Sequence, residues 1–171
     1  MKTEGKLRAY GVSLDWREEL DLVLAHTGST AVEVLFNAFH QDPLASFAKA
    51  CAQGVGIIVK VPLDSGWLSG RYRADSRFKD IRDRWTPEII ARRAGLVEEF
   101  AALLPPGRSI AHAALQYILA QPEVSTVIPG ARTPAQARDN FAASCAELPA
   151  AAAQAIHALW NDRLRADPLP W

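Results

Sequence analysis

The sequence contains few cysteines and no excess of charge of either sign. Its two cysteines, Cys51 and Cys145, lie far apart and form no CxxC pair. This excludes a disulfide framework and a structural zinc site, and we expect two free, buried thiols. Basic and acidic residues number 19 each. No overall field therefore favours nucleic acid or an anionic membrane as a partner.

Long apolar runs are also missing. No stretch approaches the ~18 consecutive apolar residues of a transmembrane helix. The first residues, Met1 to Lys6, lack the apolar centre of a signal peptide. We therefore expect a cytoplasmic protein. Because 49% of the residues are apolar and 22% are charged, the composition is that of a globular protein, and we expect a single domain over residues 1–171.

Several common catalytic and phosphate-binding motifs do not occur. GxGxxG and GxxxxGK[ST] would identify a dinucleotide fold or a P-loop, and GxSxG would identify a serine hydrolase. None of the three is present. The four histidines share no ligand spacing, so we expect no metal site.

Apolar segments with strand character alternate with helical segments along the chain. We expect strands at residues 7–13, 31–36, 55–61 and 124–128, and helices at 15–26, 42–53, 86–105, 109–121, from 133 onward, and 149–165. Such alternation predicts a parallel α/β sheet with right-handed crossovers. A (β/α)8 barrel needs roughly 250 residues. The chain therefore has strands for a parallel (β/α) half-barrel, resembling the C-terminal half of a TIM barrel.

Helix starts are marked by capping residues, and most of these precede a proline. Asp15, with Glu18 three residues later, and Asp42, followed by a proline, are expected to cap the first two helices. Thr86, Ser109 and Thr133 are expected to cap later helices.

Two segments resemble aldo-keto reductases. Residues 56–72, GIIVKVPLDSGWLSGRY, are similar to the motif at the seventh strand of that family, and residues 127–140, VIPGARTPAQARDN, are similar to its cofactor-binding loop and helix after strand eight. Residues 11–13 and 32–43 resemble the fifth and sixth strands. The likeness covers nearly the whole chain, but only the C-terminal half of the family's barrel. It implies that the N-terminal half is lacking here.

The resemblance implies a site for NADP(H). Around the adenosine 2′-phosphate and adenine it places the loop residues Gly130, Arg132, Gln136, Asp139 and Asn140. Along the pyrophosphate it places Pro62, Leu63, Ser65 and Arg71. Ser13 and Glu33 would face the nicotinamide carboxamide, and Lys60 stands where many members stack an aromatic ring on the nicotinamide. Since the family usually has Gln at the position of Glu33, the adenosine end matches the family better than the nicotinamide end.

The family's catalytic Asp, Tyr, Lys and His come from the first four strands, so we expect no catalytic residue in this sequence. Three functions remain open. The chain could be part of an oxidoreductase for carbonyl or alcohol substrates, completed by another polypeptide. It could instead be a catalytically inactive nucleotide-binding module, or a module that only self-associates. Since a four-stranded sheet has two edges and is expected to be apolar on both faces, we expect a homo-oligomer or a complementing half-barrel chain.

Each of these features also has a structural interpretation. Gln136 follows Thr133 at capping-box spacing, and Lys60 could pair with Glu33 on the sheet. His40 and Asp42 could form an acid/base pair, although a helix cap explains Asp42. The segment 71–84 is rich in arginine and lysine, which fits either a solvated loop or a lid over phosphates.

Overall fold

The computed structural model describes residues 1–170, apart from the side chain of Ile81. Within this range four parallel strands form one sheet in the order β1-β2-β3-β4. The strands span Gly11–Leu14, Ala31–Leu35, Gly56–Lys60 and Val124–Val127. The α-helices span Arg17–His26 (α1), Phe47–Ala52 (α2), Pro87–Ala102 (α3), Ile110–Leu119 (α4), Pro134–Ala142 (α5) and Ala150–Arg163 (α6). Short 3-10 turns span Asp42–Ser46 (η1), Asp64–Ser69 (η2), Ile81–Arg84 (η3) and Ala143–Cys145 (η4).

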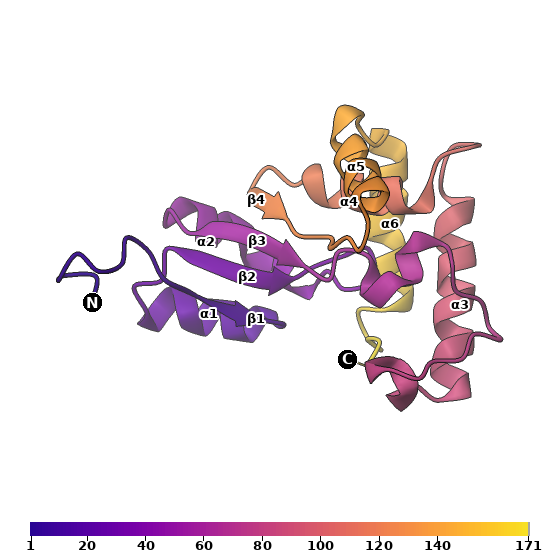
Figure 1. Cartoon of the computed structure of the whole chain (residues 1–171), viewed down its shortest axis with the longest axis horizontal. Coiled ribbons are helices and arrows are strands. Elements are labelled where there is room, and N and C mark those ends of the chain that lie inside the picture. Colours follow the sequence, from indigo (N-terminus) through magenta and orange to yellow (C-terminus); the bar gives the residue numbers. More distant parts are fainter. Residues whose placement is uncertain (171) are drawn as a thin grey trace.

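The sheet has one covered face and one open face (Figure 1). Helices α1 and α2 lie on the covered face, where Val32, Val34 and Ile57 are at most 1% exposed. Helices α3 to α6 gather at the carboxyl end of the strands. This arrangement confirms the expected parallel half-barrel.

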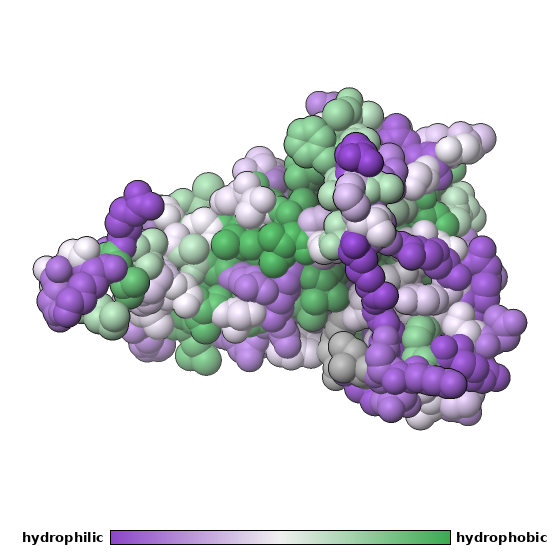
Figure 2. All heavy atoms as spheres, viewed as in Figure 1, coloured by the Kyte–Doolittle hydropathy of each residue, from purple (hydrophilic) through white to green (hydrophobic). Residues whose placement is uncertain are grey.

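The open face is more polar than the sequence led us to expect. Paired registers place Ser13 beside Glu33 and Glu33 beside Ile58, so these side chains share the open face. Lys60, two residues after Ile58, lies on the same face. The expectation of two apolar faces was wrong, because side chains alternate along each strand and the apolar set is buried on the helix side. In Figure 2 this side of the sheet shows hydrophobic and hydrophilic residues mixed.

Large exposed apolar side chains gather at the two edges of the sheet. On and beside the β1 edge, Tyr10, Val12 and Leu22 are 42–59% exposed. Next to the β4 edge, Ile128 is 47% and Phe141 of α5 is 74% exposed. None of the residues of α5 is buried. Both edges therefore combine unpaired strand backbone with apolar surface, which is typical of a sheet whose edge strands pair with further strands or pack against another polypeptide.

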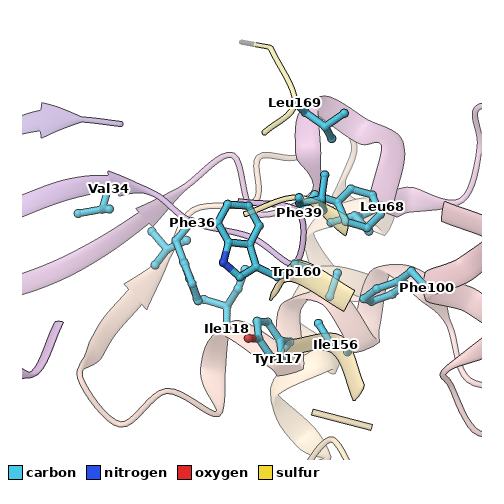
Figure 3. Close-up of a cluster of buried hydrophobic side chains, with 14 of the residues drawn as sticks. Val34, Phe36, Phe39, Leu68, Phe100, Tyr117, Ile118, Ile156, Trp160 and Leu169 are labelled. Atoms are coloured by element: carbon cyan, nitrogen blue, oxygen red, sulfur yellow. The ribbon is translucent and has the colours of Figure 1, made fainter. Parts of the chain in front are cut away.

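Among the described residues one hydrophobic core joins the sheet to α1 and α2 and extends to the C-terminal helices, and Figure 3 shows part of it. Phe36 at the end of β2 packs edge-on against Phe47 and stacks on Tyr117 of α4. Phe39 packs against Phe100 of α3 at a centroid distance of 6.0 Å. These contacts fix the helices against the carboxyl ends of the strands, which is where the loops described below begin.

Three of the expected helix caps are confirmed. Thr86, Ser109 and Thr133 each accept a hydrogen bond from the backbone amide three residues later.

The first two caps were assigned wrongly. The carboxylate of Glu19, not Glu18, accepts from the backbone amides of Asp15 and Trp16. Asp42 accepts from the backbone amide of Arg17 at 2.8 Å and therefore caps α1 rather than its own helix. This contact across the chain could not be read from local spacing.

Both cysteines are exposed, so the expected burial of Cys51 and Cys145 was wrong. Cys51 is in the last turn of α2 and Cys145 ends η4, and both segments turn these positions outward.

His40 makes the stability of this fold depend on pH. The ring is 1% exposed, and burial lowers the pKa of His40 below its usual range. The nearby carboxylates of Asp15, Asp42 and Asp64 oppose this effect. Because the unfolded chain binds a proton at higher pH than the folded one, the free energy of unfolding should fall as the pH drops below about 6.5.

Urea denaturation at a series of pH values from neutral to mildly acidic measures how steeply the free energy of unfolding depends on pH. The variant His40→Gln should have a shallower slope than the unmodified chain, while His26→Gln, which changes an exposed histidine, should keep it. Equal slopes for the unmodified chain and His40→Gln would contradict this assignment.

Candidate functional site

A groove of about 580 Å³ lies between the two loops that follow β3 and β4. One wall comes from residues 61–72 and the other from residues 128–140. Neighbouring parallel strands end at the same edge of a sheet, so the loops that follow them face each other there. The carboxyl edge is the usual place for ligands in α/β proteins.

The wall after β3 is strained. Val61, Asp64 and Ser65 have φ of +51°, +48° and +53°, a region that side chains other than glycine rarely adopt. They are the only such residues other than glycine in the described chain. The carbonyl of Val61 accepts from the Asn37 side-chain amide at 3.0 Å and from the backbone amide of Asp64. Strain held in place by surrounding bonds in this way is typical of ligand sites.

A buried ion pair anchors this strained segment to helix α3. Asp64 and Arg93 are both fully buried and are paired through their side chains. Arg93 also lies over the ring of Trp85, 4.5 Å from its centroid, and donates to the carbonyl of Pro170 at 2.8 Å. One arginine therefore joins the groove wall, helix α3 and the C-terminal tail.

The charged side chains that line the groove are positive. Three arginines, Arg71, Arg82 and Arg132, line it, and no described lining residue is an aspartate or glutamate. Arg82 pairs with Asp80 and donates to the carbonyl of Ser65 at 3.0 Å, so it is fixed against the strained wall. Within residues 1–170 the side chains of Arg71 and Arg132 form no ion pair or hydrogen bond. The groove is therefore suited to an anion.

The wall after β4 is built around the start of helix α5. Thr133 caps this helix, and the Gln136 side chain accepts from the backbone amide of Arg132 at 2.7 Å. Gly130 has φ of +69°, and its carbonyl accepts from the Asn140 side chain at 2.8 Å. Only half of the expected capping box is therefore formed, because Thr133 caps Gln136 while the Gln136 side chain binds the residue before the N-cap, and Gln136 also lines the groove. The partial positive charge of a helix start adds to that of the arginines.

The structure brings together most of the residues that the sequence suggested. The groove is lined by Pro62, Leu63, Ser65, Arg71, Gly130, Arg132, Gln136 and Asn140. Asp139 faces elsewhere, since its carboxylate lies 3.0 Å from His112 Nε2. The remaining candidates, Ser13, Glu33 and Lys60, lie on the open face of the sheet and do not line the groove.

Lys60 has other partners than the expected Glu33. Its Nζ lies 2.8 Å from the carboxylate of Asp15 and donates to Ser13 Oγ at 2.8 Å. Ser13 and Glu33 line a separate hollow of about 240 Å³. The suggested Glu33–Lys60 ion pair was therefore wrong, because the polar end of β1 approaches Lys60 more closely.

The arginines of the basic segment 71–84 have two kinds of position. Arg71 and Arg82 line the groove, whereas Arg73 and Arg77 donate to carbonyls of the loop itself. Figure 2 shows hydrophilic residues gathered over this segment at the right of the view. Arg73 and Arg77 therefore fit the interpretation as a loop with internal bonds, and the lid over phosphates stays a prediction for Arg71 and Arg82.

Sequence reasoning missed the residues that hold the groove in shape. Asn37, Asp64 and Arg93 each reach it from a different element, so no local motif includes them all. The available signal was helical spacing, since Arg93 lies three residues after Ile90 and four before Val97 on the buried face of α3. His40 is buried beside the backbone carbonyl of Asp15 and lies outside the groove lining, so the acid/base pair with Asp42 finds no support in the geometry.

A sequence profile described as "Aldo/keto reductase family" matches residues 1–161. The chain belongs to the aldo/keto reductase family.

Similar proteins are about twice as long. Aldo-keto reductase AKR11C1 from Bacillus halodurans, in its holo form, is 27% identical with a TM-score of 0.73, over 92% of this chain and 52% of its own. Glycerol dehydrogenase AKR11B4 from Gluconobacter oxydans has the same fold, at 23% identity and a TM-score of 0.71, over 99% of this chain and 53% of its own. The uncharacterized oxidoreductase YqkF of Bacillus subtilis (strain 168) is 25% identical over 147 residues, which are 84% of this chain and 47% of the relative.

The chain thus spans about half the length of the relatives it matches. Across the described residues, no helix combines the length and apolarity needed to cross a lipid bilayer.

Proposed function

We propose that this chain binds NADP(H) in the groove and forms the cofactor-binding part of a cytoplasmic oxidoreductase for carbonyl or alcohol substrates. The observation that supports this best is the arginine-lined, acid-free groove at the carboxyl edge of the sheet. It fits a dinucleotide, because the groove offers cations for phosphates and Tyr72 as an aromatic surface. When bound, the cofactor would supply the hydride.

The two walls of the groove would bind different parts of the cofactor. Pro62, Leu63, Ser65 and Arg71 would line the pyrophosphate. Gly130, Arg132, Gln136 and Asn140 would surround the phosphorylated ribose. Arg132 directly precedes Thr133, the N-cap of α5, and has an exposed guanidinium, whose forked donors match a phosphate monoester. Asp139, held by His112, would contribute through the shape of α5 rather than by contact.

We expect NADPH to bind more tightly than NADH, and Arg132→Ala should weaken NADPH by about 1 to 3 kcal/mol while leaving NADH nearly unchanged. The reason is that only NADPH carries the 2′-phosphate. Isothermal titration of both cofactors measures the difference. Arg138→Ala is the matched control, since Arg138 lies on the same helix, is exposed and does not line the groove. Equal losses for NADPH and NADH would remove Arg132 from the phosphate site.

We further propose that the two sheet edges are covered by another polypeptide, either a second copy or a complementing half-barrel chain. The support is the apolar surface at both edges and the unpaired backbone of β1 and β4. A second copy would bring two Glu33 carboxylates into the closed interior, which favours the complementing chain. Sedimentation at micromolar concentration should show self-association. Coexpression with the N-terminal half of an aldo-keto reductase barrel should replace it with a mixed complex, and a strictly monomeric chain in both experiments would contradict the proposal.

One alternative has specific support. The nicotinamide-end residues Ser13, Glu33 and Lys60 lie outside the groove, which favours a catalytically inactive nucleotide-binding module. NADPH binding without turnover in any mixed complex would select this alternative.

A further inference from the structure

The groove and the open sheet face are separate surfaces. The groove is formed by the loops after β3 and β4, whereas Ser13 and Glu33 line a hollow over β1, β2 and β3. No described residue lines both. A dinucleotide that reached from the first surface to the second would have to pass the carboxyl end of β3, where Lys60 lies.

The side chain of Lys60 spans this passage. Lys60 ends β3 and Ser13 is on β1, with β2 between them. Strands are about 4.8 Å apart, so the two backbones are about 10 Å apart. Yet Lys60 Nζ lies 2.8 Å from Ser13 Oγ and 2.8 Å from the Asp15 carboxylate. The side chain therefore crosses the end of β2 and is held there by two polar contacts, at 21% exposure.

A ring entering this passage would have to break the Lys60–Asp15 pair. The passage itself offers only the ammonium group of Lys60, the hydroxyl of Ser13 and the carboxylate of Asp15. The hollow beyond it has apolar side chains such as Ile58, and contact with them would have to offset the loss of that ion pair. A positively charged oxidised nicotinamide would also meet the charge of Lys60. The groove itself, by contrast, has cations at both walls and a volume that falls within the usual range for small-molecule sites.

From this geometry we propose that the groove is a site for a doubly phosphorylated adenosine, and that the nicotinamide half of NADP(H) adds no binding. The inference rests on the proposed function, because it concerns how much each half of NADP(H) contributes to binding in the same groove. All of the affinity then comes from phosphate and adenosine contacts with the β3 and β4 loops. The nicotinamide ring stays in water.

Calorimetric titration of the full chain with NADPH, adenosine 2′,5′-bisphosphate and reduced nicotinamide mononucleotide tests this division. The first two should bind with dissociation constants within fivefold of each other, and the mononucleotide should not bind. NADPH that binds more than fivefold more tightly than the bisphosphate would overturn the inference and leave the proposed function standing. Failure of both to bind would overturn the proposed function itself, and the inference with it.

A variant of Lys60 gives a second readout. Lys60→Met should change the dissociation constants of NADPH and of the bisphosphate by less than threefold. A change of threefold or more confined to NADPH would show that the ring contacts this position, and would overturn the inference. Lys49→Met is the matched control, since Lys49 forms a comparable pair with Asp21 on the helix side of the sheet, at 2.9 Å.

The nicotinamide fluorescence of NADPH reports whether the bound ring stays in water, and it needs no variant. The emission maximum of the bound cofactor should match that of free NADPH, because the ring remains solvated. A blue shift of this maximum on binding would place the ring in an apolar environment and contradict the proposal.

Discussion

Replacing Arg93 with methionine should lower the free energy of unfolding by about 3 to 5 kcal/mol, because the substitution leaves a buried carboxyl without its partner. Asp64 and Arg93 are both fully buried. Burial raises the pKa of Asp64, and Arg93 opposes that rise, so in the variant Asp64 should take up a proton rather than remain charged. The lost bond to the Pro170 carbonyl and the lost contact with Trp85 add to the cost.

Urea denaturation of Arg93→Met beside Arg92→Met measures this effect. Arg92 is the neighbouring arginine, and its pair with Asp167 is largely exposed, so its loss should cost at most about 1 kcal/mol. The double variant Asp64→Leu/Arg93→Met should recover much of the stability, since no buried carboxyl remains. If Arg93→Met cost no more than Arg92→Met, the pair would not anchor the fold.

The same substitution should also weaken nucleotide binding. Asp64 is one of the three residues other than glycine that adopt positive φ in the described groove wall, and Arg93 is its partner. Without this bond the backbone strain at Val61 and Ser65, which line the groove, is opposed only by the remaining hydrogen bonds from Asn37, Asp64 and Arg82. Recovery of stability in the double variant without recovery of NADPH affinity would separate the groove effect from the stability effect.

Regular structure was largely predictable from the sequence because its signals are local. The buried strands β2 and β3 follow runs of branched apolar residues, and Thr86, Ser109 and Thr133 cap helices from within their own segments. The prediction was least accurate for the start of the first strand. Residues 7–10 precede β1, where Leu7 and Tyr10 are 41% and 44% exposed, because nothing covers the edge at which they lie.

The candidate site was predictable only where it follows one stretch of chain. The loops after β3 and β4 each contribute a continuous motif, and both motifs line the groove. Contacts between distant segments were not predictable. Lys60 reaches Ser13 and Asp15, which are more than forty positions away in the sequence, and the backbone strain at Val61 depends on Asn37. Neither contact leaves a pattern in residue spacing.

The 171-residue chain on its own should reduce no carbonyl at a measurable rate. Hydride transfer to a carbonyl needs a proton donor beside the carbonyl oxygen, and the resemblance assigns that role to a tyrosine from the family's first four strands. Within the described chain, Tyr117 is buried and donates to Gln41 Oε1 at 2.6 Å, and burial raises its pKa above the usual range. Tyr72 lines the groove but packs against Trp67 and Phe78, with no lysine bonded to it. Tyr10 precedes β1, at its exposed edge.

Neither the proton donor nor the substrate-positioning groups are therefore in place. Proton donation contributes about 10² to 10⁴-fold to rate, and positioning of the reactants contributes more. Oxidation of NADPH by the purified chain with a simple aldehyde should thus equal that of a control without protein. Adding the N-terminal half of an aldo-keto reductase barrel, with its Asp, Tyr, Lys and His, should produce turnover if the edges close. Turnover by the chain alone, abolished by Lys60→Met or His40→Ala and kept by Lys49→Met, would contradict this expectation. It would show that a replacement catalytic group works at the carboxyl edge of these four strands.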